Sequence, residues 1–228
     1  MAIYLYGDLH RDNDLFPLIE QTREKKITDE DILIILGDFG GIWFNDYKDE
    51  EWIENLENTL PYKYILFVDG NHECFEKINK LPIVEMFGNP VHKCGEKTYH
   101  LMRGFRYNIN EKAFFVMGGA SSVDKFVRVK GISWWPEEMP SKEEYERAFK
   151  TLDDNEYKFD YILSHCAANS IQKGLSKFFI NKDKLTCFFE SILDDLQYKH
   201  WYFGHYHMNK TINEYNATCI YRKLIKLK

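Results

Sequence analysis

Residues 2–10 read AIYLYGDLH, an apolar run that ends in Gly and Asp with a His two positions further on. Two later runs have the same form, DILIILGD at residues 31–38 and YILFVDGN at residues 64–71. Nearly continuous Ile, Leu and Val are typical of parallel strands that are buried on both faces. The repeated pattern therefore predicts βαβ units and a parallel sheet in the first third of the chain.

The segments between these runs have the spacing of helices. DLFPLIEQTREKK at residues 14–26 and EEWIENLENTL at residues 50–60 place apolar residues three and four positions apart. Asn13 or Asp12 is a candidate cap for the first helix, with Pro17 in its opening turn.

A second sheet and a further helix are expected downstream. Residues 91–119 form short runs broken by Gly and Asn, which is typical of antiparallel hairpins. Ser141 and Glu144 form a capping box that predicts a helix to about Asp153. Later strands are expected in DYILSHC (160–166) and HWYFGHYH (200–207), and a closing hairpin in residues 211–227.

The composition is that of a globular protein. Of the 228 residues, 44% are hydrophobic and 29% are charged. Because no linker rich in Pro, Gly or Ser and no internal repeat divides the chain, we expect one domain over residues 1–228. The formal net charge of −6 argues against extended binding to duplex nucleic acid, since that binding needs Lys and Arg to neutralise phosphates.

Targeting and redox features point to the cytoplasm. The chain begins with a strand-like run instead of a basic segment followed by a long apolar one, and no apolar run reaches about 18 residues. Its five cysteines are scattered and form no C-x-x-C pair. We therefore expect a cytoplasmic protein without a membrane segment.

Each strand-like run ends in a polar cluster. In a parallel α/β sheet the carboxyl ends of the strands share one edge, so clusters that are distant in sequence converge there. On an extended segment, residues i and i+2 point to the same side, so Asp8 with His10 and His205 with His207 can each offer two side chains in one direction. The converging donors, which His72 accompanies, are Asp8, His10, Asp38, Asn71, His165, His205 and His207.

Taken singly, these residues have ordinary explanations as turn residues, helix caps or core histidines. Independent turns, however, have no reason to supply complementary ligands at five successive strand ends. Asp, His and Asn without thiolate suit Mn, with Fe or Zn as alternatives, and seven donors exceed what one ion takes from a protein. Two divalent ions roughly 3.5–4 Å apart, bridged by a carboxylate, would clamp a phosphoryl group and activate water as hydroxide.

The order of these clusters resembles that of the calcineurin-like metallophosphoesterases. Their motifs D-x-H, GD, GNH[DE], H and GHxH are all present between residues 8 and 207. The resemblance implies an α/β fold, a four-layer αββα sandwich of two mixed sheets with a dimetal site at their edge.

The resemblance also implies the site roles. Asp38 would bridge the two ions. His72 would lie over the leaving-group oxygen as a general acid or a stabiliser of charge, a task suited to imidazole. The first metal would be held by Asp8, His10, Asp38 and His207, and the second by Asp38, Asn71, His165 and His205.

The sequence departs from the family pattern in two places. Many members carry a second Asp three residues after the bridging one, where it orients the His of GNH, but this chain has Gly41. The partner of His72 is therefore open. Arg11 stands where the family often has Gly after D-x-H, and it is either a phosphate clamp or a solvated turn residue.

Residues 118–138, GGASSVDKFVRVKGISWWPEE, read as a long loop beside the site. Arg128 is a candidate phosphate ligand, with a solvent-facing Arg as the alternative. Trp134 and Trp135 either pack the loop onto the domain or stack on a base or aryl group. Cys166, next to His165, is expected to be a small buried hydrophobe.

These features predict an enzyme, a dimetal phosphoesterase that hydrolyses a phosphomonoester of a phosphoprotein or a small molecule by metal-activated hydroxide. One alternative is a phosphodiesterase acting on cyclic nucleotides or single-stranded nucleic acid. The other is a metal-binding scaffold without catalysis. The sequence leaves the oligomeric state open.

Overall fold

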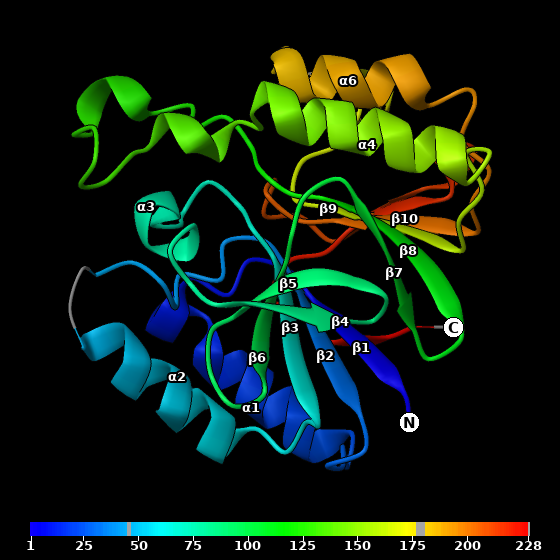
Figure 1. Cartoon of the computed structure of the whole chain (residues 1–228). Helices are drawn as coiled ribbons and strands as arrows, with labels where there is room; N and C mark the ends of the chain where they lie inside the picture. Colours follow the sequence, from blue (N-terminus) through cyan, green and yellow to red (C-terminus); the bar gives the residue numbers. More distant parts are fainter. Residues whose placement is uncertain (45–46, 177–180, 228) are drawn as a thin grey trace.

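Two mixed β-sheets lie face to face, and helices cover the outer face of each (Figure 1). The computed structural model describes residues 1–44, 47–176 and 181–227. The first sheet has the order β13-β1-β2-β3-β6-β5-β4. Its strands are β1 (Ile3–Tyr6), β2 (Ile32–Leu36), β3 (Tyr64–Val68), β4 (Ile83–Met86), β5 (Asn89–Lys93), β6 (Thr98–Leu101) and β13 (Ile225–Lys226).

The second sheet has the order β11-β12-β10-β9-β8-β7. Strands β8, β9, β10 and β12 run parallel, while β7 and β11 are antiparallel edge strands. Its strands are β7 (Phe105–Ile109), β8 (Lys112–Met117), β9 (Tyr161–Ser164), β10 (His200–Phe203), β11 (Lys210–Ile212) and β12 (Ala217–Cys219).

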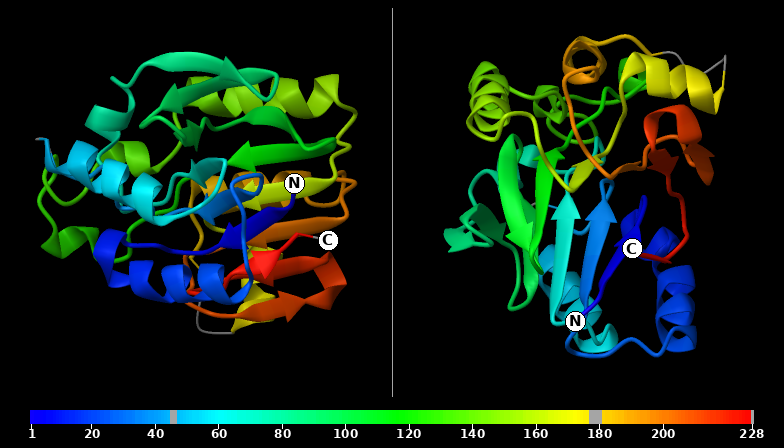
Figure 2. Two further views of the ribbon diagram at one scale, coloured as in Figure 1. Left: turned by 90° about the horizontal axis from the view of Figure 1, so that it is seen from below. Right: turned by 90° about the vertical axis from the view of Figure 1, so that its right-hand side faces the viewer.

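Helices form the two outer layers (Figure 2). Helices α1 and α2 lie against the first sheet, and α4, α5 and α6 against the second. The bounds are α1 (Leu15–Glu24), α2 (Lys48–Thr59), α3 (Phe75–Ile78), α4 (Lys142–Asp154), α5 (Asn169–Leu175) and α6 (Lys184–Ile192). Short 3₁₀ turns are η1 (Arg11–Asn13), η2 (Lys125–Val127), η3 (Pro136–Glu138) and η4 (Asn213–Tyr215).

Alternating side chains along the strands separate three apolar cores. In β1, Ile3 and Leu5 face the core between the sheets, where they join Val116 and Leu163 of the second sheet. The intervening Tyr4 and Tyr6 face the core under α1 and α2, and a third core lies between the second sheet and its helices. Three cores between four layers confirm the predicted αββα sandwich.

The parallel strands β1, β2 and β3 are confirmed, as are the helices α1 and α2 between them. The predicted cap of α1 is wrong. This helix begins after Asp14, whose side chain makes no cap hydrogen bond. The Asp14 carboxylate instead accepts from His10 Nδ1 at 2.8 Å and pairs with Arg222. Asp12 accepts from Trp52 Nε1, so a contact with α2 takes the place of the expected capping role.

The predicted hairpins form, but they do not all belong to the second sheet. Residues 91–119 contain two antiparallel pairs, yet β5–β6 belongs to the first sheet and only β7–β8 to the second. The closing segment forms the β11–β12 hairpin and then crosses to the first sheet, where β13 pairs antiparallel with β1. Over the described ranges, no helix is both long and apolar enough to cross a bilayer.

The capping box of α4 is confirmed and gives a test of the local fold. Ser141 Oγ accepts from the Glu144 amide at 3.2 Å, and Glu144 reaches back to the Ser141 amide at 2.7 Å. Replacing Ser141 with Ala should lower the free energy of unfolding by about 1 kcal/mol in urea denaturation. Lys142→Ala, one residue on, should change it by less than about 0.5 kcal/mol, and equal effects would contradict the capping role.

Candidate metal centre

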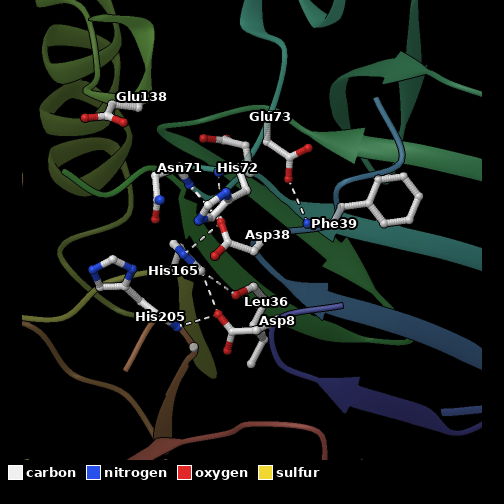
Figure 3. Close-up of polar contacts among 12 residues, drawn as sticks. Asp8, Leu36, Asp38, Phe39, Asn71, His72, Glu73, Glu138, His165 and His205 are labelled. Carbon is white, nitrogen blue, oxygen red and sulfur yellow. Dashed lines mark hydrogen bonds and ion pairs between the residues drawn. The ribbon is translucent and has the colours of Figure 1, made fainter. Parts of the chain in front are cut away.

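The seven predicted ligands follow the carboxyl ends of five strands, at the edge where the two sheets meet. Asp8 and His10 follow β1, Asp38 follows β2 and Asn71 follows β3. In the second sheet, His165 follows β9, and His205 and His207 follow β10. Figure 3 shows most of these side chains turned toward one another around Asp38.

The backbone of the ligand pairs is not extended, so the geometric reason for expecting Asp8 with His10 and His205 with His207 to point the same way is wrong. Asp8 (φ 56°), His10 (φ 47°), His205 (φ 67°) and His207 (φ 48°) are left-handed, and Asp38 (φ 46°) shares that conformation. Because none of them is extended, the strand rule that aligns residues i and i+2 does not apply. A left-handed residue other than Gly costs roughly 1–2 kcal/mol, and such residues cluster at functional sites.

The Asp38 carboxylate lies between two imidazoles. Its Oδ2 is 3.3 Å from His10 Nε2, and its Oδ1 is 3.2 Å from His165 Nε2. Oδ1 also accepts the backbone N–H groups of Asn71 at 2.9 Å and His72 at 3.0 Å. Each oxygen therefore faces a different histidine.

Hydrogen bonds on the far side of each ring set its tautomer. His10 Nδ1 lies 2.8 Å from a carboxylate oxygen of Asp14, and His165 Nδ1 lies 2.9 Å from the Leu36 carbonyl. Both partners only accept, so Nδ1 carries the proton in each ring. In each neutral ring, Nε2 then carries a lone pair that faces a carboxylate oxygen of Asp38. Two such electron-rich atoms repel each other unless a proton or a cation lies between them.

Three buried atoms that could ligate a metal have no hydrogen-bond partner within the described part of the chain. Asp8 Oδ2, Asn71 Oδ1 and His165 Nε2 make no hydrogen bond there. Such atoms cost free energy unless an ion or water satisfies them. One ligand atom from each of Asp8, His10, Asp38 and His207 lies within 4.8 Å of the others, which is the set that the resemblance assigned to the first metal. These donors fit a hard or borderline divalent ion.

Two glycines bring the ligand loops together. A Cβ on Gly37 would lie 2.0 Å from His165 Nδ1, and Gly37 also has φ +87°. A Cβ on Gly70 would lie 2.1 Å from Asp38 Oδ1. Larger residues at these positions would push the second sheet's histidine and the Asn71 loop away from the centre.

Neighbouring charges shift the pKa values of the buried groups in the site. Burial opposes charge on Asp38, but His165 and His10 hold the pKa of its carboxyl well below the usual range. Burial also opposes charge on His165, yet Asp38 and Asp8 raise its pKa to about 9. Without an ion, a second proton on His165 therefore lies at Nε2, between the ring and Asp38, where a metal cation could bind instead.

The Asn71 amide is oriented by a chain of hydrogen bonds. Ser122 Oγ donates to Glu138 Oε2 at 2.6 Å, and Glu138 Oε1 accepts from the Ser122 amide at 2.9 Å. With its proton thus committed, Ser122 Oγ accepts from Asn71 Nδ2 at 3.1 Å. The amide oxygen of Asn71 is left facing the centre. Ser122 and Glu138 are both buried.

His72 is flanked by a cation. The two terminal nitrogens of Arg128 each lie 3.4 Å from one ring nitrogen of His72. Asp124 holds that guanidinium through Nε at 2.7 Å and Nη2 at 2.9 Å. Burial lowers the pKa of His72, and Arg128 lowers it further against the pull of Asp38.

Gly41 has no room for the carboxylate that many family members carry. A Cβ there would lie 2.4 Å from Phe39 Cε1 and 2.6 Å from Trp52 Cζ3. The aromatic packing under α2 has taken that space, and the Arg128–Asp124 pair contacts His72 from another loop.

Arg11 lies beside the centre but is committed to protein contacts. Its guanidinium donates to Asp49 at 2.8 Å and to the Lys48 carbonyl at 2.9 Å. It also lies 5.1 Å from the ring centres of Phe44 and Trp52. A substrate role for Arg11 stays a prediction, as does that of Arg128.

The long loop is packed at its base. Trp135 is buried against Trp43, Cys74 and Phe75, while Trp134 is half-buried. The packing interpretation therefore holds for Trp135. Cys166 is 2% exposed within the core under α4, as expected.

Sequence reasoning missed the residues that support the ligands. Asp14 orients His10 and lies four residues after it, so spacing on a turn is the one signal that was available. Ser122 and Glu138 are distant in sequence from Asn71 and carry no motif. Glu73, which accepts from the Phe39 amide at 2.7 Å and so holds the turn after Asp38, is visible only as the last letter of GNHE (Figure 3).

Comparison with known proteins identifies the family of the chain. Residues 1–209 match the calcineurin-like phosphoesterase family. No curated protein matches the chain. Among solved structures, GAP50, the anchor in the inner membrane complex of Plasmodium, is similar with a TM-score of 0.56 at 13% identity, over 97% of this chain and 71% of that one.

Two other structures are similar at lower scores. A putative 5′-nucleotidase from Staphylococcus aureus has a TM-score of 0.49 at 13% identity, covering 99% of this chain and 50% of that one. The phosphopantetheinyl hydrolase of Mycobacterium tuberculosis has a TM-score of 0.48 at 14% identity, covering 96% and 88%. At such identities the likeness to GAP50 supports the fold alone.

The chain from Glu138 to Asn71 gives a test that does not depend on activity. In Glu138→Gln the new amide nitrogen faces Ser122 Oγ, so the hydroxyl proton needs a new acceptor. A rotation of the Asn71 amide that exchanges its nitrogen and oxygen would supply one and would turn the oxygen away from the centre. We expect Mn²⁺ binding at the Asn71 side to weaken by roughly 10-fold, as for other supporting residues of metal ligands.

The measurement is Mn²⁺ titration by calorimetry, with metal content determined on the same samples. Glu137→Gln, an exposed neighbour, is the matched control and should bind Mn²⁺ as the natural chain does. An unchanged affinity in folded Glu138→Gln would show that Asn71 needs no such orientation.

Proposed function

We propose that this chain, which belongs to the calcineurin-like phosphoesterase family, hydrolyses a phosphomonoester at a centre of two divalent metal ions. The family is metal-dependent, so the chain is a metal-dependent phosphoesterase. The number of ions, the ion type and the monoester preference are the parts that we add.

One observation carries the proposal of two ions. The two oxygens of Asp38 face histidines on opposite sides, His10 at 3.3 Å and His165 at 3.2 Å. A carboxylate with a different ligand at each oxygen is the arrangement that a bridge between two cations needs.

Two groups of residues would hold the ions. Asp8, His10 and His207 would share the first with Asp38, and Asn71, His165 and His205 would share the second with it. Because the set contains carboxylate, imidazole and amide without thiolate, we propose Mn²⁺, with Fe or Zn as alternatives. When bound, such ions polarise the phosphoryl group and activate water for in-line attack.

His72 would act on the leaving group. Its backbone is tied to Asp38 Oδ1 and its ring lies 5.5 Å from that of His10, so it faces the centre. Arg128, held against the ring by Asp124, would bind a phosphoryl oxygen, because a guanidinium suits phosphate geometry. The pair places a positive charge where negative charge develops.

The structure supports an active enzyme over an inert scaffold, since every ligand position of the family is filled. All five cysteines are free thiols, which suits the cytoplasmic location that we propose. The diester alternative is decided by experiment.

Asp38→Asn removes the bridging charge and tests the mechanism. We expect the rate of 4-nitrophenyl phosphate hydrolysis in Mn²⁺ to fall by roughly 100-fold or more, because ions that each provide several kcal/mol lose their shared ligand. Metal content should fall with it. Asp29→Asn, at an exposed turn before β2, is the matched control. Unchanged activity in Asp38→Asn would overturn the dimetal mechanism.

The same assay separates the candidate substrates. Hydrolysis of the 4-nitrophenyl monoester but not of bis(4-nitrophenyl) phosphate is the expected result. Faster hydrolysis of the diester would make the chain a phosphodiesterase, and hydrolysis of neither ester by Mn²⁺-loaded protein would favour the scaffold.

A further inference from the structure

A cavity of about 190 Å³ opens directly beside the metal centre. It is lined by His10, Arg11, Asn13, Gly40, Trp43, Phe44 and His72. Two of these residues, His10 and His72, belong to the centre as well. A ligand that fills the cavity therefore reaches the reacting groups.

Trp43 and Phe44 form an aromatic part of the cavity wall, and protein contacts hold both side chains. Trp43 packs edge-on against buried Trp135, with ring centres 5.3 Å apart. The Trp43 amide donates to Asp49 Oδ2 at 2.8 Å. Phe44 is held beneath the Arg11 guanidinium and still leaves 42% of its surface exposed. A preformed wall loses little entropy when a ligand binds.

The cavity is not built for a second phosphate. Its one cation, Arg11, is already paired with buried Asp49, which also accepts from Lys77. Apart from Asn13 and Gly40, the other lining residues present the rings of His10, Trp43, Phe44 and His72. Flat apolar groups stack favourably on such rings, and a ring of any type has the required face.

The size of the cavity matches one flat ring. An apolar protein cavity of about 150 Å³ is known to bind benzene. At about 190 Å³, this cavity has room for a single aromatic ring, and it is open to solvent on the side away from the protein.

We propose that the cavity bounded by Trp43, Phe44 and His72 binds an aromatic ring in the leaving group of the substrate, so that the substrate is an aryl or nucleoside-type phosphate ester. This inference rests on the proposed function, which places the phosphoryl group at the metal ligands and His72 at the leaving-group oxygen. The group attached to that oxygen then extends past His72 into the cavity.

Binding of two phosphonates tests the inference without turnover. Phenylphosphonate and methylphosphonate carry the same metal-binding head, and only the first has a ring. In calorimetric titration of the Mn²⁺-loaded protein, we expect phenylphosphonate to bind roughly 10-fold more tightly, because its ring can stack on the aromatic side chains of the cavity.

Two variants locate the preference. Phe44→Ala should reduce the ratio of the two affinities to about one while the affinity for methylphosphonate stays the same. Phe149→Ala is the matched control, because Phe149 is 41% exposed, close to the 42% of Phe44, and lies on α4 away from the cavity. Trp43→Phe keeps a ring in the wall and should retain most of the preference.

The outcomes separate the two proposals. Equal affinities in the natural chain, or a preference that survives Phe44→Ala, would overturn the ring site and leave phosphoester hydrolysis standing. A ring preference that Phe44→Ala abolishes, in a protein that hydrolyses neither nitrophenyl ester, would support the binding site and contradict the proposed reaction. Binding of neither phosphonate to Mn²⁺-loaded protein would overturn the ring site as well.

Discussion

The charge on Asp38 is the constraint on which the site depends. A buried carboxylate is stable only with partners for its oxygens, and Asp38 obtains them from the Asn71 and His72 amides, from His10 and from His165. These partners come from both sheets. The edge where the sheets meet must therefore be closed around one carboxylate, which fixes the relative position of the ligand loops. Glu73 strengthens this by holding the Phe39 amide of the turn that carries Asp38.

The close approach of these loops explains why the backbone there is unusual. Gly37 and Gly70 leave no space for a side chain, and Asp8, His10 and Asp38 adopt left-handed conformations. The sandwich provides the rigidity that stabilises them, because three apolar cores hold the strands on which the loops begin and end. Local preference alone would give a different turn. The ligands are placed by the packed sheets rather than by their own segments.

This difference sets how much the sequence can predict. Parallel strands were predictable because buried runs of Ile and Leu report burial directly. That the seven proposed ligands lie at one edge was predictable because each follows a strand-like run. The assignment of β5 and β6 to the first sheet was not, since hairpin patterns do not say which sheet a hairpin joins. Ser122, Glu138 and Trp43 were missed for the same reason. Their roles come from contacts between distant segments, which leave no periodicity or motif in the chain.

The loop after β8 contacts both His72 and Asn71, two residues with proposed roles at the metal centre. Near its start, Ser122 accepts a hydrogen bond from the Asn71 amide, and near its end Glu138 accepts one from Ser122. Between them the loop carries Arg128 to His72. Arg103 ties the end of the loop to the same region, because it pairs with Asp69 at 2.6 Å and donates to the Glu137 carbonyl at 3.0 Å. A displacement of the loop that moved Arg128 from His72 and carried Ser122 or Glu138 with it would release the Asn71 amide. The loop that contacts His72, the proposed leaving-group residue, therefore also orients Asn71, a proposed metal ligand.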